Sequence, residues 1–471
     1  MSKKSERRQT AVQELMEIDL GDPRRAARAR LLVGRLAHIP GRSIPDAMGN
    51  EAEVEAAYRH LSSDSVTLEG ILLPHVLKTK ERVRRGGVAY AVHDTTELTF
   101  GGEKKREGLG PVNGKDQGFL AHLSLAVSAD GERTPLGLLA VGTRVRRSVG
   151  KGTGVERYKW ALGIEHASRD LPKDALIHLA DRECDIFESI AACIKQEVRF
   201  IFRAAQDRAV LVQELGEAAV SRLFAAARAA EPVMEVEADV SARGAHKRCA
   251  KEIRRFPVRR ARKAMLAYSA ISVELKRPRH SRKAEGLPES VKVNVVRAWE
   301  PNPPEGEPPV EWVLLTNEPV DSPEHIRRVV DGYRTRWVIE EYNKALKSGC
   351  AFEQAQLESA HALLNLLGYC LVIAYVLLLM RALSRSKTKI PASDVFTPEQ
   401  LACLQGLSRR VKLPPEPTAD QALLACAGLG GHMKRNGLPG WRTLSRGYAR
   451  LLEYERGYII GRASQADCDQ S

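Results

Sequence analysis

The sequence predicts an α/β core flanked by helical segments, and three observations support this. Between residues 87 and 203, short apolar runs alternate with helical stretches. Residues before about 70 and beyond about 355 have helical patterns. The chain of 471 residues is 43% hydrophobic and 28% charged. That composition excludes a wholly disordered, fibrous or multi-span membrane protein. The length suits two or three domains at about 150 residues each.

The charge balance indicates a polyanionic partner. The chain has 73 Lys and Arg against 59 Asp and Glu, a formal charge of +14. Such an excess favours nucleic acid as a partner, although many basic proteins are merely soluble. The eight cysteines include no CxxC pair, and the basic start has no signal-peptide pattern. We therefore expect a reducing cytosol and no disulfides.

Short helices are expected in residues 1–70. Asp22 is a plausible N-cap, with Pro23 at the first helical position. Four basic residues follow in this helix: Arg24, Arg25, Arg28 and Arg30. A small basic helical unit can hold a DNA-binding helix pair, but it can equally be a solvated bundle. These residues leave both interpretations open.

The central part has the alternation of an α/β fold. An apolar run at 88–93 ends at Asp94, and a second run at 175–180 ends at Asp181. The turn signal at 129–131 predicts a hairpin of strands 119–128 and 136–145. Further elements complete the region: helices at about 155–169 and 185–195, and a strand at 199–203.

The second half begins with a less regular segment. Residues 205–310 are strand-rich and include a basic stretch at 243–263, which suits either phosphate contact or a solvated face. A strand at 312–316 follows, and Ser322 with Pro323 opens a long helix. The apolar run at 362–380 is long enough to span a membrane. Because it stands alone in a basic chain and follows a patterned helix, we interpret it as a buried core helix.

One face of the helix after Ser322 concentrates functional side chains. Tyr333, Arg336, Glu340 and Lys347 have the spacing Tyr-x₂-Arg-x₃-Glu-x₆-Lys, which places them on one face of a continuous helix. Trp337 and Lys344 are close to that face. By itself, the stripe could be a solvated face with an Arg336–Glu340 ion pair.

The carboxylates suggest a more specific site. Asp94 and Asp181 each follow an apolar run, and neighbouring strand ends would bring them close together. A third carboxylate from a packed helix would complete a set of hard oxygen ligands for Mg²⁺ or Mn²⁺. Two such ions about 4 Å apart can drive in-line displacement at a phosphodiester.

Three blocks of sequence carry a resemblance to a known family. They are Asp94-Thr95-Thr96, the run Asp-Arg-Glu-Cys-Asp-Ile at 181–186, and the Tyr-Arg-Glu-Lys helix at 333–347. Together they resemble the signatures of bacterial DDE transposases of the insertion-sequence-four family. Further similar stretches lie at 20–25, 314–320 and 430–433, so the resemblance spans nearly the whole chain. Cys184 is a departure, because the family commonly has alanine there.

The resemblance implies a domain plan and a metal site. The plan is a helical DNA-end-binding domain at 1–70, a ribonuclease-H-like catalytic domain at 71–355 with a β-rich insertion at about 205–310, and a helical C-terminal dimerisation domain at 356–471. Asp94, Asp181 and Glu340 would be the catalytic residues and the metal ligands. The implied cofactor is Mg²⁺, with Mn²⁺ as a substitute and two ions per active site.

The resemblance also implies roles for the residues around the metal. Trp312 would stack an extruded base, and Trp337 would fill the space that the base leaves. Phosphate contacts would come from five further residues: Tyr333, Arg336, Lys344, Lys347 and Arg203. Near the start of the chain, Arg24 and Arg25 would contact the backbone of the DNA end.

The expected function is cut-and-paste DNA transposition. Family members bind inverted-repeat ends, hydrolyse one strand, form and reopen a hairpin, and join the 3′ ends to target DNA. The expected partners are double-stranded DNA and a second copy of the chain in the DNA complex, with no membrane. The expected location is the bacterial cytoplasm, on the nucleoid when bound to DNA.

Two other functions stay open on the sequence. One is a catalytically inactive DNA-binding relative or inhibitor, and the other is a metal-dependent nuclease with the same core. The three intact acidic residues favour catalysis. Trp312 and the stripe at 333–347 favour strand transfer, since simple hydrolysis has no use for a base-extrusion pocket.

Overall fold

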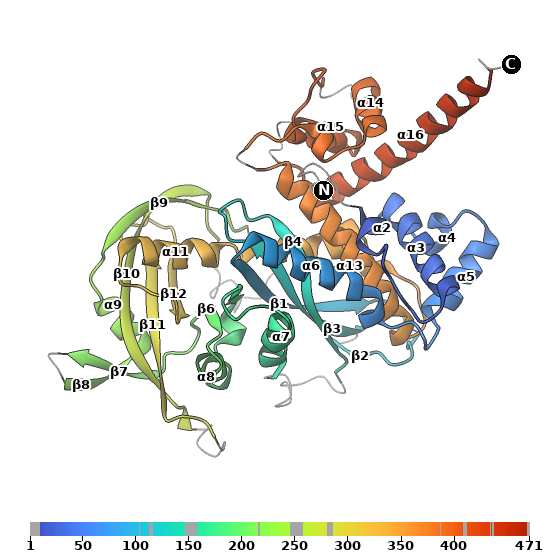
Figure 1. Ribbon diagram of the computed structural model, residues 1–471. Helices are drawn as coiled ribbons and strands as arrows, with labels where there is room; N and C mark the ends of the chain where they lie inside the picture. Colours follow the sequence, from blue (N-terminus) through green and yellow to red (C-terminus); the bar gives the residue numbers. More distant parts are fainter. Residues whose placement is uncertain are drawn as a thin grey trace. The chain divides into compact units, whose positions relative to one another are not determined.

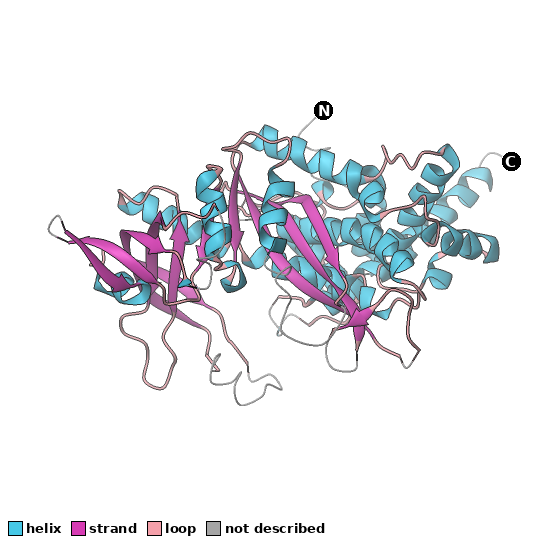
Figure 2. Cartoon of the chain, turned by 90° about the horizontal axis from the view of Figure 1, so that it is seen from below, coloured by secondary structure: helices cyan, strands magenta, loops and turns pink. Residues whose placement is uncertain are grey.

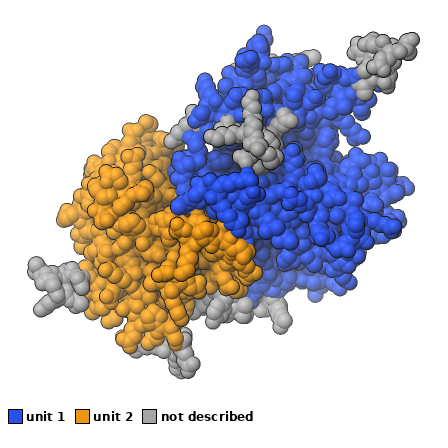
Figure 3. All heavy atoms as spheres, viewed as in Figure 1, with its two compact units in different colours: residues 1–89, 94–152, 337–471 blue, residues 90–93, 153–336 orange. Residues whose placement is uncertain are grey.

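The computed structural model describes residues 10–102, 104–112, 116–146, 158–214, 217–244, 258–279, 286–386, 388–407, 412–433, 435 and 438–468. The chain forms two compact units (Figure 3). Unit 1 comprises residues 1–89, 94–152 and 337–471, and unit 2 comprises residues 90–93 and 153–336. Helices and strands are distinguished by colour in Figure 2.

From residue 10, where the described part of unit 1 starts, the chain forms five helices before its first strand (Figure 1). The predicted cap of the second one is confirmed, because the Asp22 side chain accepts hydrogen bonds from the backbone N–H groups of Arg24 and Arg25, with Pro23 at the first position. Asn50 and Thr67 cap two of the later helices in the same way. The five helices are α2 (Ala11–Glu14), α3 (Pro23–His38), α4 (Ile44–Ala47), α5 (Glu51–Leu61) and α6 (Leu68–Gly86).

The strands of unit 1 surround the predicted hairpin, which is confirmed. β3 (Gln117–Ser128) pairs antiparallel with β4 (Pro135–Arg144), and Gly131 adopts a positive φ in the turn between them. β2 (Gly110–Pro111) pairs with the start of β3, and β1 (Ala89–Phe100) is the neighbour of β3 that follows it in the strand order. Nearly every residue of β3 is buried, as expected for a strand covered on both faces.

The last part of unit 1 is helical and contains its core. It holds α12 (Trp337–Lys344), the π-helical segment η4 (Ala345–Gly349), η5 (Phe352–Gln354), α13 (Ala360–Leu383), η6 (Ala392–Asp394), α14 (Pro398–Leu407), α15 (Ala419–Leu429) and α16 (Trp441–Cys468). Among the described residues, α13 alone is long and apolar enough to cross a membrane. However, 89% of its most apolar stretch is buried, against α5, α6, β4 and η4. The interpretation of a core helix is therefore confirmed.

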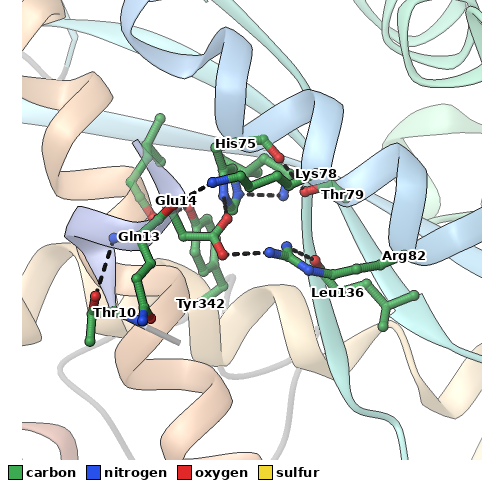
Figure 4. A network of polar contacts seen from close by, with 11 residues as sticks. Thr10, Gln13, Glu14, His75, Lys78, Thr79, Arg82, Leu136 and Tyr342 are labelled. Atoms are coloured by element: carbon green, nitrogen blue, oxygen red, sulfur yellow. Dashed lines mark hydrogen bonds and ion pairs between the residues drawn. The ribbon is translucent and has the colours of Figure 1, made fainter. Parts of the chain in front are cut away.

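A buried polar network ties α2 and α6 to β4 (Figure 4). His75 Nε2 accepts a 3.0 Å hydrogen bond from the Leu138 backbone N–H, so Nδ1 carries the proton that His75 donates to Glu14 Oε2 at 2.6 Å. Arg82 pairs with the other carboxylate oxygen of Glu14 and donates to the Leu136 carbonyl at 2.7 Å. Each member is satisfied, so this network fixes the start of the chain on the hairpin.

Unit 2 is built on a mixed sheet. The first residues of β1 belong to it, and the strand order continues β5, β6, β12, β11, β10, β7, β8, with β9 beside β10. β5 and β6 are parallel, whereas the other measured pairs in this unit are antiparallel. The strands are β5 (Leu176–Ala180), β6 (Arg199–Arg203), β7 (Ala209–Glu214), β8 (Glu217–Arg222), β9 (Met234–Val240), β10 (Arg262–Lys276), β11 (Ser290–Trp299) and β12 (Glu311–Thr316).

Helices and a short 3₁₀ turn complete unit 2. They are α7 (Tyr158–Ser168), η2 (Arg182–Cys184), α8 (Phe187–Lys195), α9 (Leu223–Ala229) and α11 (Pro323–Arg334). The core gathers aromatic side chains of α7, α8 and β6, namely Trp160, Phe187, Phe200 and Phe202, with the valines of β10 and β11. Ser322 caps α11 as predicted, through the His325 backbone N–H.

Two predictions about local structure are wrong. Asp94 does not end its strand, because the alternation of buried and half-buried residues continues through Thr96 to Phe100 and extends β1 past it. The helix opened by Ser322 is not continuous. Thr335 and Arg336 form a turn with i→i+3 hydrogen bonds, and α12 begins only at Trp337. The π-helical segment η4 has a different number of residues per turn, which changes the direction of successive side chains again before Lys347. The single-face argument for the stripe therefore fails.

Candidate active site

The acidic residues that the sequence singled out are divided between the two units. Asp94 on β1 and Glu340 on α12 belong to unit 1, whereas Asp181 follows β5 in unit 2. All three side chains are half-buried. The residues of each unit are therefore described separately.

In unit 1, a hydrogen bond joins the strand of Asp94 to the helix of Glu340. Asn343 Nδ2 donates to Asp94 Oδ2 at 2.8 Å. Asn343 lies one turn after Glu340 on α12, so both residues are on the same side of the helix. The structure therefore brings the elements of Asp94 and Glu340 together.

The other side of the Asn343 amide is unusual. Its Oδ1 is buried and has no hydrogen-bond partner among the described residues. A buried acceptor without a partner costs about 1–3 kcal/mol. A carboxylate only accepts hydrogen bonds, so the amide must present its NH₂ group to Asp94 and cannot flip to satisfy the oxygen. Sequence reasoning missed Asn343, although its i+3 position after Glu340 was available as a signal.

The lysines of the stripe have partners inside unit 1. Lys347 Nζ donates to the Glu97 carbonyl of β1 and forms a 3.4 Å ion pair with Glu353. Lys344, which is exposed, pairs with Glu341 at 2.9 Å. Trp337 is 53% exposed and therefore presents a large apolar surface on α12. These three side chains come from α12 and η4.

In unit 2, a short capped turn positions Asp181. Asp181 is the N-cap of η2, and its Oδ1 accepts a 2.9 Å hydrogen bond from the Glu183 backbone N–H. The next acidic residue, Asp185, is buried and anchors the loop, because it pairs with the buried Arg208 at 2.6 Å and accepts from two backbone N–H groups. Of the three carboxylates in the Asp-Arg-Glu-Cys-Asp block, Asp181 is therefore half-buried, Glu183 is exposed and Asp185 is structural.

Aromatic and cationic groups gather in the same unit. The rings of Trp312 on β12 and Tyr333 on α11 meet edge to face, with centroids 5.7 Å apart. The Arg203 guanidinium lies 6.0 Å from the Trp312 ring. The sequence therefore identified three residues that the structure brings together.

The electrostatics place further charges next to this cluster. Burial, together with the positive charges of Arg182 and Arg336, lowers the pKa of Arg203 to about 10. Burial also raises the pKa of Tyr333, and the carboxylate of Asp181 adds to that rise. Arg203, Arg182 and Arg336 with Tyr333 and Trp312 are called the guanidinium cluster below. Three guanidinium groups beside one carboxylate form a site that an anion would stabilise.

Arg182 was not among the predicted site residues. Its Nε is buried and has no hydrogen-bond partner among the described residues. Its position directly after Asp181, in the block of six residues at 181–186, could have identified it from the sequence.

The residues of unit 1 fit a hard cation. Asp94 provides a half-buried carboxylate, and the Asn343 oxygen beside it has no hydrogen-bond partner among the described residues. Carboxylate and amide oxygens are the ligands that Mg²⁺ and Mn²⁺ prefer. In the described part of the chain, no three His, Cys, Asp or Glu side chains gather closely enough to form a complete metal site.

The basic residues near the start of the chain have different surroundings. Arg24 is exposed on the first turn of α3. Arg25 is half-buried, and its Nη1 donates to the Leu20 carbonyl at 2.8 Å. The basic stretch at 243–263 lies largely outside the described residues. Near the end of this stretch, Arg262 forms ion pairs with Glu300 and Glu307.

Among the residues that the structure describes, six cysteines are free and buried: Cys184, Cys193, Cys350, Cys370, Cys403 and Cys426. Burial raises the pKa of Cys184 well above its ordinary value. The thiolate, which is the form that oxidants attack, is therefore disfavoured at this departure from the family pattern.

Comparison with known proteins gives one family match. Residues 7–66, which include α2 to α5, match the family model of transposase DNA-binding domains. This match supports a DNA transposase with a DNA-binding N-terminal region.

Among solved structures, the chain is similar to a piggyBac transposase synaptic complex with hairpin DNA, determined by cryo-EM. The TM-score is 0.33 and the sequence identity 10%, over 76% of this chain and 66% of that chain.

Proposed function

We propose that this protein is a cut-and-paste DNA transposase of the insertion-sequence-four family, with a resemblance to the transposon-five transposase. The observation that carries the proposal is the Asn343–Asp94 hydrogen bond, which joins the strand of one motif to the helix of another. The transposase DNA-binding match at 7–66 supports DNA as the partner.

The proposed catalytic residues and metal ligands are Asp94, Asp181 and Glu340, in a ribonuclease-H-like core. Mg²⁺, or Mn²⁺ in its place, would activate an attacking oxygen and neutralise the leaving oxygen of a phosphodiester, with two ions per site. The chain's own contribution is to hold these carboxylates in place. Asn343 restrains Asp94, and the η2 turn restrains Asp181.

The guanidinium cluster suits the DNA beside the reacting phosphodiester. Its cations can hold a phosphate, and Trp312 provides a face on which an extruded base can stack. Both groups serve a hairpin step, which needs the end nucleotide bent away from the duplex. In unit 1, the proposed DNA contacts are Lys344, Lys347 and the exposed Trp337. Lys347 would have to exchange Glu353 for a phosphate.

The remaining parts of the proposal concern assembly. Residues 1–70 bind inverted-repeat ends with Arg24 and Arg25 at the backbone, residues 71–355 hold the catalytic core, and residues 356–471 pair two protomers. The ends are then joined to target DNA in the bacterial cytoplasm, on the nucleoid.

One assay tests the reaction. The protein is incubated with Mg²⁺ and labelled DNA that carries the end sequences flanking its own gene. Hairpins and joined products are expected. Nicks alone would support a metal nuclease, and a shifted band without cleavage would support an inactive DNA-binding relative.

A pair of variants tests the metal ligands. Asp181→Asn removes a negative charge with little change in shape, so we expect cleavage to fall at least about 100-fold while end binding in a band-shift assay is retained. Glu183→Gln is the matched control, because Glu183 is exposed and two residues away. Full activity of Asp181→Asn would contradict the assignment.

A further inference from the structure

Asn343 has no role in the motifs that identified the site, yet its position is specific. Its side chain reaches from α12 to β1 and donates to Asp94 Oδ2 at 2.8 Å. All the residues involved belong to unit 1, and Glu340 precedes Asn343 by one helical turn.

Two properties of the amide point to a ligand. A purely structural asparagine in such a place would have both ends satisfied, because buried polar groups nearly always have partners. Here only the donor end is used, and Oδ1 is buried without a hydrogen-bond partner among the described residues. An unused neutral oxygen beside an acidic residue suits a hard divalent cation.

We propose that Asn343 is a positioning residue of the acidic site, which fixes the rotamer of Asp94 and adds a neutral oxygen toward the divalent cation. This inference rests on the proposed function. Groups that orient a ligating carboxylate affect metal affinity and activity by about 10–100-fold when they are removed. The chemistry of Asp94 and Glu340 themselves stays the same.

Two substitutions separate the parts of this role. Asn343→Leu has a similar shape but removes both the donor and the oxygen. Asn343→His keeps a donor, because its Nδ1 is the same number of bonds from Cα as the asparagine Nδ2. Asn294→Ala is the control, since Asn294 also donates a 2.8 Å hydrogen bond, to the Glu318 carbonyl in unit 2.

The first measurement is the Mg²⁺ concentration that gives half-maximal end cleavage. We expect Asn343→Leu to raise it about 10–100-fold, Asn343→His to restore it at least in part, and Asn294→Ala to leave it unchanged. End binding should be the same in all variants. A half-maximal Mg²⁺ concentration within about twofold of the wild type in Asn343→Leu would overturn the proposal.

The second measurement does not depend on cleavage. Mn²⁺ binding to the DNA-free protein is followed by the electron paramagnetic resonance signal of free Mn²⁺, with Glu340→Gln defining the specific site. Weaker binding in Asn343→Leu, with binding recovered in Asn343→His, would support the positioning role. Equal binding in the wild type and both variants would overturn it.

The two measurements also distinguish failures. A wild type that binds Mn²⁺ at this site but makes no hairpins or joined products would refute the proposed function and leave the Mn²⁺ comparison as the test of Asn343. Thermal unfolding without metal identifies a folding defect. If Asn343→Leu unfolds at a lower temperature than the wild type, the Asn343→His variant provides the test. Mn²⁺ binding as strong as in the wild type would support the role of Asn343 as a hydrogen-bond donor, and loss of Mn²⁺ binding would overturn it.

Discussion

Arg24 and its neighbour Arg25 on α3 have different surroundings. The Arg24 side chain is exposed, whereas Arg25 is half-buried and donates a hydrogen bond to the Leu20 carbonyl. From the sequence we assigned the same role to both arginines, because their spacing does not show which side chain is exposed and which one donates a hydrogen bond to the preceding loop. The N-terminal family match, which includes α3, supports DNA binding by this region, so the exposed arginine is the better candidate for phosphate contact.

We expect Arg24→Ala to weaken end binding without loss of stability. Removing one phosphate contact should reduce the slope of log affinity against log salt by about 1, and affinity should fall similarly for specific and non-specific DNA. Fluorescence anisotropy at several salt concentrations measures both effects. Arg169→Ala is the control, because Arg169 is an exposed arginine directly after the last residue of α7. An unchanged slope for Arg24→Ala would argue against the contact.

Trp312 is the second residue with a specific expectation. If an extruded base stacks on it, Trp312→Ala should reduce hairpin formation at least about tenfold more than first-strand nicking, since stacking on one base contributes about 1–3 kcal/mol. Gel analysis of both products gives the ratio. Trp299→Ala is a matched control, because Trp299 also lies under an arginine, Arg297 at 4.0 Å. Equal losses in nicking and hairpin formation would exclude the stacking role.

At the scale of elements, β5 and α7 are joined by a chain of hydrogen bonds that requires a neutral histidine. Ser168 donates to the Ile164 carbonyl at 2.8 Å, so its Oγ accepts from His178 Nε2 at 3.1 Å. His178 Nδ1 then accepts from His93 Nε2 at 2.8 Å. Protonation of Nδ1 would break this contact. Burial accordingly lowers the pKa of His178 to about 3.

This arrangement predicts acid sensitivity of unit 2. Below the ordinary histidine pKa of about 6.5, the unfolded chain takes up a proton that folded His178 refuses, so stability falls as the pH falls from about 6.5 toward 3. Linkage gives a loss of about 2 kcal/mol in unfolding free energy between pH 7 and pH 5. Urea unfolding should show this loss in the wild type and a smaller one in His178→Phe. His166→Gln, exposed on α7, should behave as the wild type.

The elements also show where sequence reasoning succeeds. Caps, turns and apolar runs are local, so the Asp22 cap, the hairpin about Gly131 and the α11 start at Ser322 were predictable. The extension of β1 beyond Asp94 and the break at Thr335 were not. Thr335 and Arg336 are buried, and packing at that point outweighs the preference of the backbone for one continuous helix.

At the scale of the whole molecule, the chain passes between its two units next to the proposed catalytic residues. Asp94 is the first residue after the chain returns to unit 1 from residues 90–93. Glu340 lies three residues after Trp337, where the chain returns to unit 1 again. Asp181 stays in unit 2. The wide separation of these three acidic residues along the sequence therefore follows the division of the chain into two units and does not reflect a local motif.

The proposed dimer leads to a test by mixing variants. If each DNA end is bound by one protomer and cut by the other, Asp181→Asn and Arg24→Glu protein should be almost inactive separately. Their mixture should nick single ends, because an end bound by the Asp181→Asn protomer is cut by the intact site of its partner. Denaturing gels of labelled ends measure the nick. Absence of nicking in the mixture, with both variants folded, would indicate cutting within one protomer.

The amino-acid sequence shows which kinds of chemistry the protein has available: three separated carboxylates, an aromatic and basic helix, and an excess of positive charge. These features depend on residue identity and short-range order, which can be read directly from the sequence. Which of these residues meet depends on the tertiary structure. It joined Arg203, Trp312 and Tyr333, paired Lys347 with Glu353, and brought Asn343 to Asp94. The reason is physical: residues 249 positions apart become hydrogen-bonded only when packing brings α12 beside β1, and no local pattern encodes that contact.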